Sequence, residues 1–525
     1  MVAGAVLLAA LGAAVYANSL AVPFLFDDRP AILNNPHVRR LWPIDAAVGA
    51  PARSVLTGRP VASLSFALNH AAGGLDPRGY HAVNVGLHVL SAVVLLGLVR
   101  RMLGTPPLAP KFGAARGSLA LAVAAIWLVH PLQTEAVTYV TQRTELLMGL
   151  FVLLTVYCAL RDWTVASILG CALAVGSKET AVAAPLLVVV HDRLFRFASL
   201  RDAWRARRAL YLGLAASWCL LAVSLAALPR HESIGFGHGI SALEYARTQL
   251  EVVTDYLRLA LWPASLCVDH GVWIAERLLP GALVVGAVIA LTLSGLRRRL
   301  PAGFAGAWLL LLLAPTSSVV PITTEVMAER RMYLPLAAVV AVVVCGGYRI
   351  VGSIVTRARV RHAMNAALVG VVVTILATLA VRRNRDYASE IGLWRDVLAK
   401  RPENARAHNN LASLLLHAGD LDGAGAELTA AVRLRPDYAE AYYNLGVIRL
   451  ARGQLDEAAG EFRVALAHDP RLVEAHYNLG TIHLQQGRYG DAVAEYEETL
   501  RLDPSHANAR TNLGVAQRAL TDARR

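Results

Sequence analysis

The feature that most constrains this chain is a series of apolar runs that fills its first 381 residues. Most of the runs approach the roughly 20 residues that an α-helix needs to cross a bilayer, and polar flanks complete the shorter ones. We therefore expect an all-α membrane domain of about eleven spans. The runs cover residues 3–22, 82–100, 118–132, 145–160, 163–177, 180–195, 209–228, 279–296, 303–320, 332–348 and 363–381.

The composition also indicates a membrane protein. Of the 525 residues, 56% are hydrophobic and 17% are charged, and the mean hydropathy is +0.46. That is too apolar for an ordinary soluble enzyme. Residues 402–525 hold 13 Lys and Arg against 17 Asp and Glu, so the net charge of +13 originates in the preceding part of the chain. There the basic residues cluster between apolar runs, which indicates cytoplasmic loops and not a nucleic-acid partner.

These basic clusters predict the orientation of the membrane domain. They follow the second, sixth, eighth and tenth runs, and eleven spans place all four in the cytoplasm. The N-terminus is then cytoplasmic, and residues 23–80 and the C-terminal region are external. Three arginines after the last run, Arg382, Arg383 and Arg385, oppose this trend. The segment 243–263 is amphipathic and favours a helix at the membrane interface; counting it as a twelfth span would reverse everything downstream.

A second periodicity governs the C-terminal region. Pro402, Pro436, Pro470 and Pro504 are 34 residues apart, and each unit carries an Asn-Leu-Gly or Asn-Leu-Ala step and a glycine turn. This pattern resembles the tetratricopeptide repeat, an α-solenoid that binds peptides or partner helices. We expect the membrane domain over 1–381, with a first external loop at 23–80, and the repeats over 386–525. The repeat units are a degenerate one at 386–401, then 402–435, 436–469 and 470–503, and a partial one at 504–525.

The polar residues of the predicted external loops form the candidate site. Two adjacent carboxylates, Asp27 and Asp28, follow the first apolar run. Ionisable groups that converge at a membrane face usually mark a site or a path, although each one singly reads as a solvated loop residue. A lipid-linked sugar phosphate would need cations for its phosphate and a carboxylate base for the acceptor hydroxyl. The other candidates are Glu135, Arg143, Lys178, Glu179, Glu329, Arg330 and Arg331.

Several strings together resemble one family. They are FLFDDRPAILNNPHV, GRPVASLSFALNHAAGGLDPRGYHAVNVGLHVL, HPLQTEAVTYVTQRTELL, SKETAVAAPLLVVVHD and AERRMYLPLA, and repeats follow them. In this order they are similar to the transmembrane O-mannosyltransferases with tetratricopeptide repeats, of the GT-C superfamily. The resemblance implies transfer of a sugar, mannose in characterised members, from a polyprenyl phosphate to Ser or Thr of a protein, with inversion.

The same resemblance assigns the catalytic pair to Asp27 and Asp28, with Asp28 the first choice as base. It carries over to Glu135, Arg143, Lys178, Glu179, Glu329 and Arg330 by motif position only, without individual roles. With Arg331, which the charge argument adds, we expect these residues at the donor phosphate or in the shell behind its ligands. Glu145 stands where the family motif often has Asp, which favours a structural role there. His81, Asn84 and His88 share one helix face, and we expect them to make interhelical hydrogen bonds in preference to a metal site.

The expected partners are the bilayer, the polyprenyl-linked sugar and an acceptor polypeptide or partner protein on the repeats. The sequence leaves open a divalent cation. The Ala, Arg and Leu content fits a GC-rich bacterial source, hence a multi-pass protein of the inner membrane with periplasmic repeats. Two alternatives remain: a ligase or polymerase of lipid-linked polysaccharide, and a non-catalytic membrane-anchored scaffold.

Overall fold

The computed structural model describes residues 1–50, 54–227, 240–276, 278–318, 322 and 325–525. All regular elements in this part of the chain are helices, which confirms the predicted all-α class. The chain divides into two compact units, Met1–Leu393 and Trp394–Arg525.

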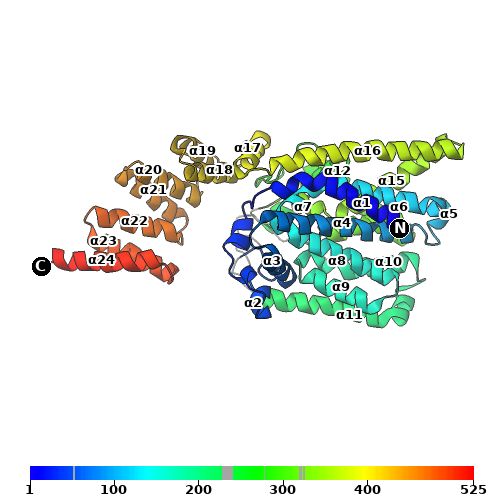
Figure 1. Cartoon of the computed structure of the whole chain (residues 1–525), viewed down its shortest axis with the longest axis horizontal. Helices are drawn as coiled ribbons and strands as arrows, with labels where there is room; N and C mark the ends of the chain where they lie inside the picture. Colours follow the sequence, from blue (N-terminus) through cyan, green and yellow to red (C-terminus); the bar gives the residue numbers. More distant parts are fainter. Residues whose placement is uncertain (51–53, 228–239, 277, 319–321, 323–324) are drawn as a thin grey trace. The chain divides into compact units, whose positions relative to one another are not determined.

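The first unit is a bundle whose long helices run side by side (Figure 1). Its α-helices are α1 (Val2–Tyr16), α2 (Ile44–Val48), α3 (Pro60–Gly73), α4 (Pro77–Met102), α5 (Ala109–Phe112), α6 (Arg116–Val129), α7 (Thr134–Thr138), α8 (Arg143–Leu160), α9 (Thr164–Val175), α10 (Ala184–Phe195), α11 (Leu200–Ala227), α12 (Ala242–Leu261), α13 (Leu278–Arg297), α14 (Ala302–Leu313), α15 (Pro335–Ile354) and α16 (Ala358–Asp386). Short helical turns connect them: η1 (Ala17–Ala21), η2 (Arg29–Leu33), η3 (His37–Arg39), η4 (Gly113–Ala115), η5 (Pro131–Gln133), η6 (Val140–Gln142), η7 (Glu179–Ala183) and η8 (Glu329–Met332).

Eight helical segments of the described chain are long and apolar enough to cross a membrane. They consist mainly of α1, α4, α6, α8, α11, α13, α15 and α16. The shorter helices α9 and α14 are apolar as well. Each of the eleven apolar runs overlaps one of the helices, so their helical character is confirmed. The number of spans and the orientation stay predictions.

The burial of the helices follows their sequence. α6 is apolar and buried on nearly all sides from Leu119 to Val129, since it lies against α1, α4, α15 and α16. α13 and α16 instead expose most of their apolar side chains, as helices facing lipid do. α12 buries one face, including Val252 and Tyr256, and a capping box of Ser241 and Glu244 starts it.

The second unit consists of paired helices. After α17 (Glu390–Lys400), which crosses the boundary between the units, the pairs are α18 (Ala405–His417) with α19 (Leu421–Leu434), α20 (Ala439–Ala451) with α21 (Leu455–His468), and α22 (Val473–Gln485) with α23 (Tyr489–Leu502), followed by α24 (Ala507–Ala523).

Small residues set the close approach within each pair. A Cβ on Gly446 would lie 2.6 Å from Phe462, and one on Gly480 would lie 3.0 Å from Tyr496. The turns between paired helices use Gly419, Gly453 and Gly487 at φ of +82°, +74° and +72°, a conformation that glycine adopts without strain.

Candidate active site

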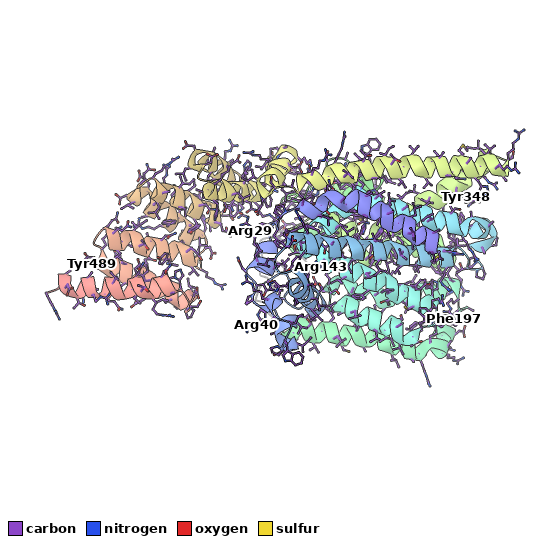
Figure 2. The ribbon with its side chains drawn as sticks, viewed as in Figure 1. Arg29, Arg40, Arg143, Phe197, Tyr348 and Tyr489 are labelled. Atoms are coloured by element: carbon purple, nitrogen blue, oxygen red, sulfur yellow. The ribbon has the colours of Figure 1, made fainter. Side chains whose placement is uncertain are left out.

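The predicted site segments gather at one end of the bundle, which we call the polar end. It comprises residues 22–34, 59–76, 130–145, 177–179, 265–275, 325–332 and 383–390, whose side chains bond across segments. Figure 2 shows Arg29 and Arg143 at this end, and Phe197 and Tyr348 at the opposite one. Five of these segments, 22–34, 59–76, 130–145, 177–179 and 325–332, come from loops that the sequence analysis assigned to the external face, while 265–275 and 383–390 were not predicted to belong to the site. The membrane side of this end stays a prediction.

The aspartate loop, residues 22–28, joins η1 to η2 and carries both candidate carboxylates. Phe26 adopts a φ of +37°, which is uncommon for a bulky side chain and costs about 1–3 kcal/mol. Contacts on both sides hold this turn. The amide of Asp27 donates to the Tyr139 hydroxyl at 2.9 Å, and the amide of Phe26 donates to Glu390 at 3.2 Å.

The two aspartates lie in different environments. Asp28 is fully buried, and its two carboxyl oxygens accept hydrogen bonds from the amides of Leu25 at 2.9 Å and Thr141 at 2.8 Å. Asp27 is half-exposed. Asp28 therefore fixes the loop against η6, while Asp27 is the more exposed of the two carboxylates.

Burial also changes the acidity of Asp28. Removal from water raises the pKa of this carboxyl from 3.8 to about 7, even though the two amide donors lower it. The charge of Asp27 pushes the pKa further upward. Asp28 is therefore a weaker acid than an exposed aspartate.

A second cluster joins α7 to η8, the helical turn before α15. Glu135 is fully buried and accepts from the amide of Arg330 at 2.8 Å and from its guanidinium at 2.5 Å. The same guanidinium also pairs with Glu325. Arg330 is thus shared between two carboxylates.

The neighbours of Arg330 have other tasks. Glu329 is buried and accepts from the amide of Cys267 at 2.6 Å, and His270 Nε2 lies 3.1 Å from the same oxygen. Arg331 donates to the backbone carbonyls of Thr316, Glu325 and Val326, so it holds the fold of its own loop.

Lys178 and Glu179 are adjacent but take part in separate ion pairs. Lys178 pairs with Glu145 of α8 in a buried contact. Glu179 accepts two hydrogen bonds from Arg59, at 3.2 and 2.9 Å. Burial alone would raise the pKa of Glu179, but Arg59 and Lys178 outweigh it and hold the pKa at about 2.

Arg143 is fully buried at the start of α8, and its guanidinium is enclosed. It donates to Asn84 and Asn69 at 2.8 Å each, to Tyr80 O at 2.9 Å and to Ser65 O at 3.2 Å. It also stacks over the ring of Phe66 at 4.4 Å. The observed partners of all four predicted cations, Arg143, Lys178, Arg330 and Arg331, are protein groups.

The histidine face of α4 makes the interhelical hydrogen bonds that its spacing predicted. His81 Nε2 lies 2.9 Å from Val22 O, and His88 bridges the Tyr333 hydroxyl and Leu128 O. Asn84 donates to two carbonyls of the 137–140 segment. Within the described ranges, no group of three or more His, Cys, Asp or Glu is arranged to hold a metal ion.

Sequence reasoning missed Tyr139, Thr141, His270 and Glu390, which complete the surroundings of the predicted residues. Tyr139 and Thr141 lie in the HPLQTEAVTYVTQRTELL string and could have been selected by proximity to Glu135. Glu390 lies in the α17 segment, which its repeat-like pattern marked only as part of the solenoid.

Three tetratricopeptide-repeat models match the chain, at residues 376–439, 415–481 and 473–506. The repeats predicted from the proline spacing are thereby confirmed. Among solved structures, the crystal structure of MamA protein is 26% identical and covers 27% of this chain and 76% of its own, with a TM-score of 0.24.

Curated relatives carry one common name. The protein O-mannosyl-transferase Tmtc1 of Drosophila melanogaster is 36% identical over 200 residues, 35% of this chain and 22% of that protein. The protein O-mannosyl-transferase F38B6.6 of Caenorhabditis elegans is 24% identical over 451 residues, 76% of this chain and 58% of that protein. TMTC3 of Mus musculus, of the same name, is 35% identical over 155 residues, 28% of this chain and 16% of that protein. The chain thus spans between 16% and 58% of the length of these relatives.

Proposed function

We propose that this chain, a homologue of the protein O-mannosyl-transferases with tetratricopeptide repeats, is itself a membrane glycosyltransferase. It transfers mannose from a polyprenyl phosphate to Ser or Thr hydroxyls of proteins at the external membrane face. The names of the relatives support protein O-mannosylation in general. The donor, the membrane face and the acceptor rest on the resemblance of the motifs and on the chemistry of the polar end.

The observation that carries the proposal is the unequal pair Asp27 and Asp28. A general base must lie within hydrogen-bond reach of the proton it removes. Asp27 is half-exposed, so an acceptor hydroxyl can approach it, whereas Asp28 is enclosed and bonded to two backbone amides. We therefore assign the base to Asp27 and the positioning of the loop to Asp28, which reverses the preference for Asp28 in the sequence analysis.

The proposed reaction is a single displacement at the anomeric carbon of the mannosyl group. The acceptor hydroxyl gives its proton to Asp27 while its oxygen attacks the anomeric carbon of the mannosyl group from the side opposite the phosphate. The bond between that carbon and the phosphate oxygen breaks, and the polyprenyl phosphate leaves with the electron pair. The product is an inverted glycoside on Ser or Thr, and Asp27 later releases the proton to water.

The repeats are proposed to bind the acceptor polypeptide or a partner protein, as arrays of this kind do. For the protein to act in one compartment, the polar end and the repeats must both be external, in the periplasm if the source is bacterial. A reporter fused after residue 401 tests this placement, because a cytoplasmic signal would contradict it.

Reconstitution tests the function directly. The full chain, purified in detergent, is incubated with polyprenyl-phosphate mannose and with a peptide rich in Ser and Thr, and the peptide is analysed by mass spectrometry. We expect single hexose additions to Ser or Thr. Transfer to a glycan acceptor alone would indicate a polysaccharide ligase, and no transfer to any acceptor would favour a scaffold; both results contradict the proposal.

A further inference from the structure

The outer surface of the first unit carries a groove between α1 and α16 with a volume of about 570 Å³. Its walls come from one face of each helix, because the lining residues recur every three to four positions. They are Leu11, Ala14 and Val15 of α1, and Val373, Thr374, Ala377, Thr378, Val381, Arg382 and Arg385 of α16.

Most of the groove is apolar. Thr374 and Thr378 donate their hydroxyls to backbone carbonyls of their own helix, to Gly370 at 2.9 Å and to Thr374 at 2.8 Å. The hydrogen-bonding capacity of both donors is therefore used within α16. The small side chains of Ala14 and Ala377 leave the space that an occupant would fill.

One end of the groove is cationic. Arg382 and Arg385 are exposed, lie one helical turn apart, and have no ion-pair partner among the described residues. Their neighbour Asn384 points inward instead, where it donates to Val15 O and accepts from Thr138 of α7. The cationic end thus lies at the polar end of the bundle, where the aspartate loop also lies.

We propose that this groove binds the polyprenyl-phosphate carrier, with its isoprene units along the apolar walls and its phosphate on Arg382 and Arg385. The proposal rests on the proposed function and names the donor site for it. Guanidinium groups bind phosphate through paired hydrogen bonds. The four cations that the sequence predicted at the phosphate, Arg143, Lys178, Arg330 and Arg331, are engaged with protein groups, whereas Arg382 and Arg385 line the groove.

The chemistry of the transfer adds a reason for two arginines. The donor is a phosphodiester with one negative charge, and the leaving group is a phosphomonoester that gains further charge. Cations at this position therefore stabilise the charge that develops as the sugar departs. The same site accounts for two of the three arginines that oppose the charge trend of the other loops, since Arg383 is buried and pairs with Asp386.

Lipid binding tests the site without any sugar transfer. The full chain in detergent is titrated with undecaprenyl phosphate and analysed by native mass spectrometry. We expect Arg382→Gln with Arg385→Gln to weaken binding about tenfold or more, since each lost charged hydrogen bond lowers affinity. Ala377→Phe, which fills the slot, weakens it as well.

Matched controls lie on the same helix. Arg359→Gln removes an exposed arginine of the first turn of α16, and Ala366→Phe enlarges an exposed alanine outside the groove. Both should bind as the wild type does. Phosphatidylglycerol, an ordinary anionic lipid, should compete poorly.

Unchanged affinity in the double arginine variant, or equal competition by phosphatidylglycerol, would overturn the inference. The two proposals fail separately. Specific binding without any sugar transfer would refute the proposed function and leave the groove intact. Transfer by the double arginine variant with the wild-type KM for the donor would refute the groove and leave the function intact.

Discussion

Arg29 donates a hydrogen bond to Glu390 across 2.8 Å, and Glu390 also accepts from the amide of Phe26. The side chain of Glu390 is largely buried, with 13% exposed. These two bonds bracket Asp27 and Asp28 along the chain. Glu390 thus holds the strained turn that presents Asp27.

Replacing Glu390 tests this positioning role. We expect Glu390→Ala to lower kcat about tenfold with little change in protein yield, because each bond is worth about 1 kcal/mol. Glu390→Gln, which keeps an acceptor for Phe26, should recover part of the rate. Glu403→Ala, which removes an exposed glutamate in the turn after α17, serves as the control. A wild-type kcat in Glu390→Ala would show that the loop holds itself.

The Lys178–Glu145 pair separates a structural role from a role at the phosphate. We expect Lys178→Met alone to lower the free energy of unfolding by about 3–5 kcal/mol, since it leaves a buried carboxylate without its partner. Lys178→Met with Glu145→Leu should restore thermal stability. If transfer activity returns together with thermal stability in the double variant, the pair is structural. If thermal stability returns and transfer activity does not, Lys178 contacts the substrate.

An exposed pair provides the comparison for that experiment. Asp162 lies at the surface and pairs with Arg196 at 2.9 Å, with 61% of its side chain exposed. Surface pairs contribute about 0–1 kcal/mol, so Asp162→Asn should change the melting temperature little.

Arg143 should not tolerate lysine. Its guanidinium serves four acceptors in different directions and stacks on Phe66, and a lysine ammonium cannot reach all of them. We expect Arg143→Lys to lower the free energy of unfolding by about 3 kcal/mol. Arg100→Lys, at the half-exposed end of α4, is the control. Wild-type stability with a raised KM for the donor would instead place Arg143 at the phosphate.

The repeats contain a pH-dependent contact at His476. Its Nδ1 lies 2.6 Å from Glu495 and its Nε2 lies 3.1 Å from Pro470 O, so both bonds form only when the ring is protonated. The hydrogen bond to Glu495 raises the pKa of His476 above 6.5, against burial. Because the pKa is raised in the folded state, protonation of His476 stabilises the folded repeats. This stabilisation is complete below about pH 6.5 and is lost as the pH rises through the folded-state pKa.

Hydrogen exchange of α22 and α23 measures this effect. At pH 6, the amides of α22 and α23 should exchange much more slowly in the wild type than in His476→Gln. This difference should shrink at pH 9. His417→Gln, an exposed histidine of α18, should show no such trend. A difference that stays constant with pH would contradict the protonated contact.

The fold was predictable because its signals are local. The apolar runs and the 34-residue spacing of Pro402, Pro436, Pro470 and Pro504 each reflect a single helix or helix pair. The packing reason for the Asn-Leu-Gly step was also readable, since Gly446 and Gly480 meet aromatic rings across each pair.

The site was predictable only as a set of segments. Glu135 and Arg330 are 195 residues apart, and nothing in the sequence specifies their pairing. Adjacent residues such as Asp27 and Asp28 look equivalent in sequence, but their burial depends on how η6 packs against the loop. The partners of the cations expected at the phosphate also depend on how distant segments pack, and in the structure these partners are protein groups.

If Asp27 is the base and Asp28 holds its loop, the variants Asp27→Asn and Asp28→Asn should differ in transfer kinetics and in loop dynamics. We predict that Asp27→Asn lowers kcat by about 10²–10⁴ while the protein folds normally. Asp28→Asn should loosen the aspartate loop, seen as faster hydrogen exchange in residues 25–28, since an amide oxygen can serve only one of the two backbone donors. Asp45→Asn, an exposed acid in the same predicted external loop, should leave both readouts unchanged. Wild-type kcat in Asp27→Asn would show that Asp27 is not the base.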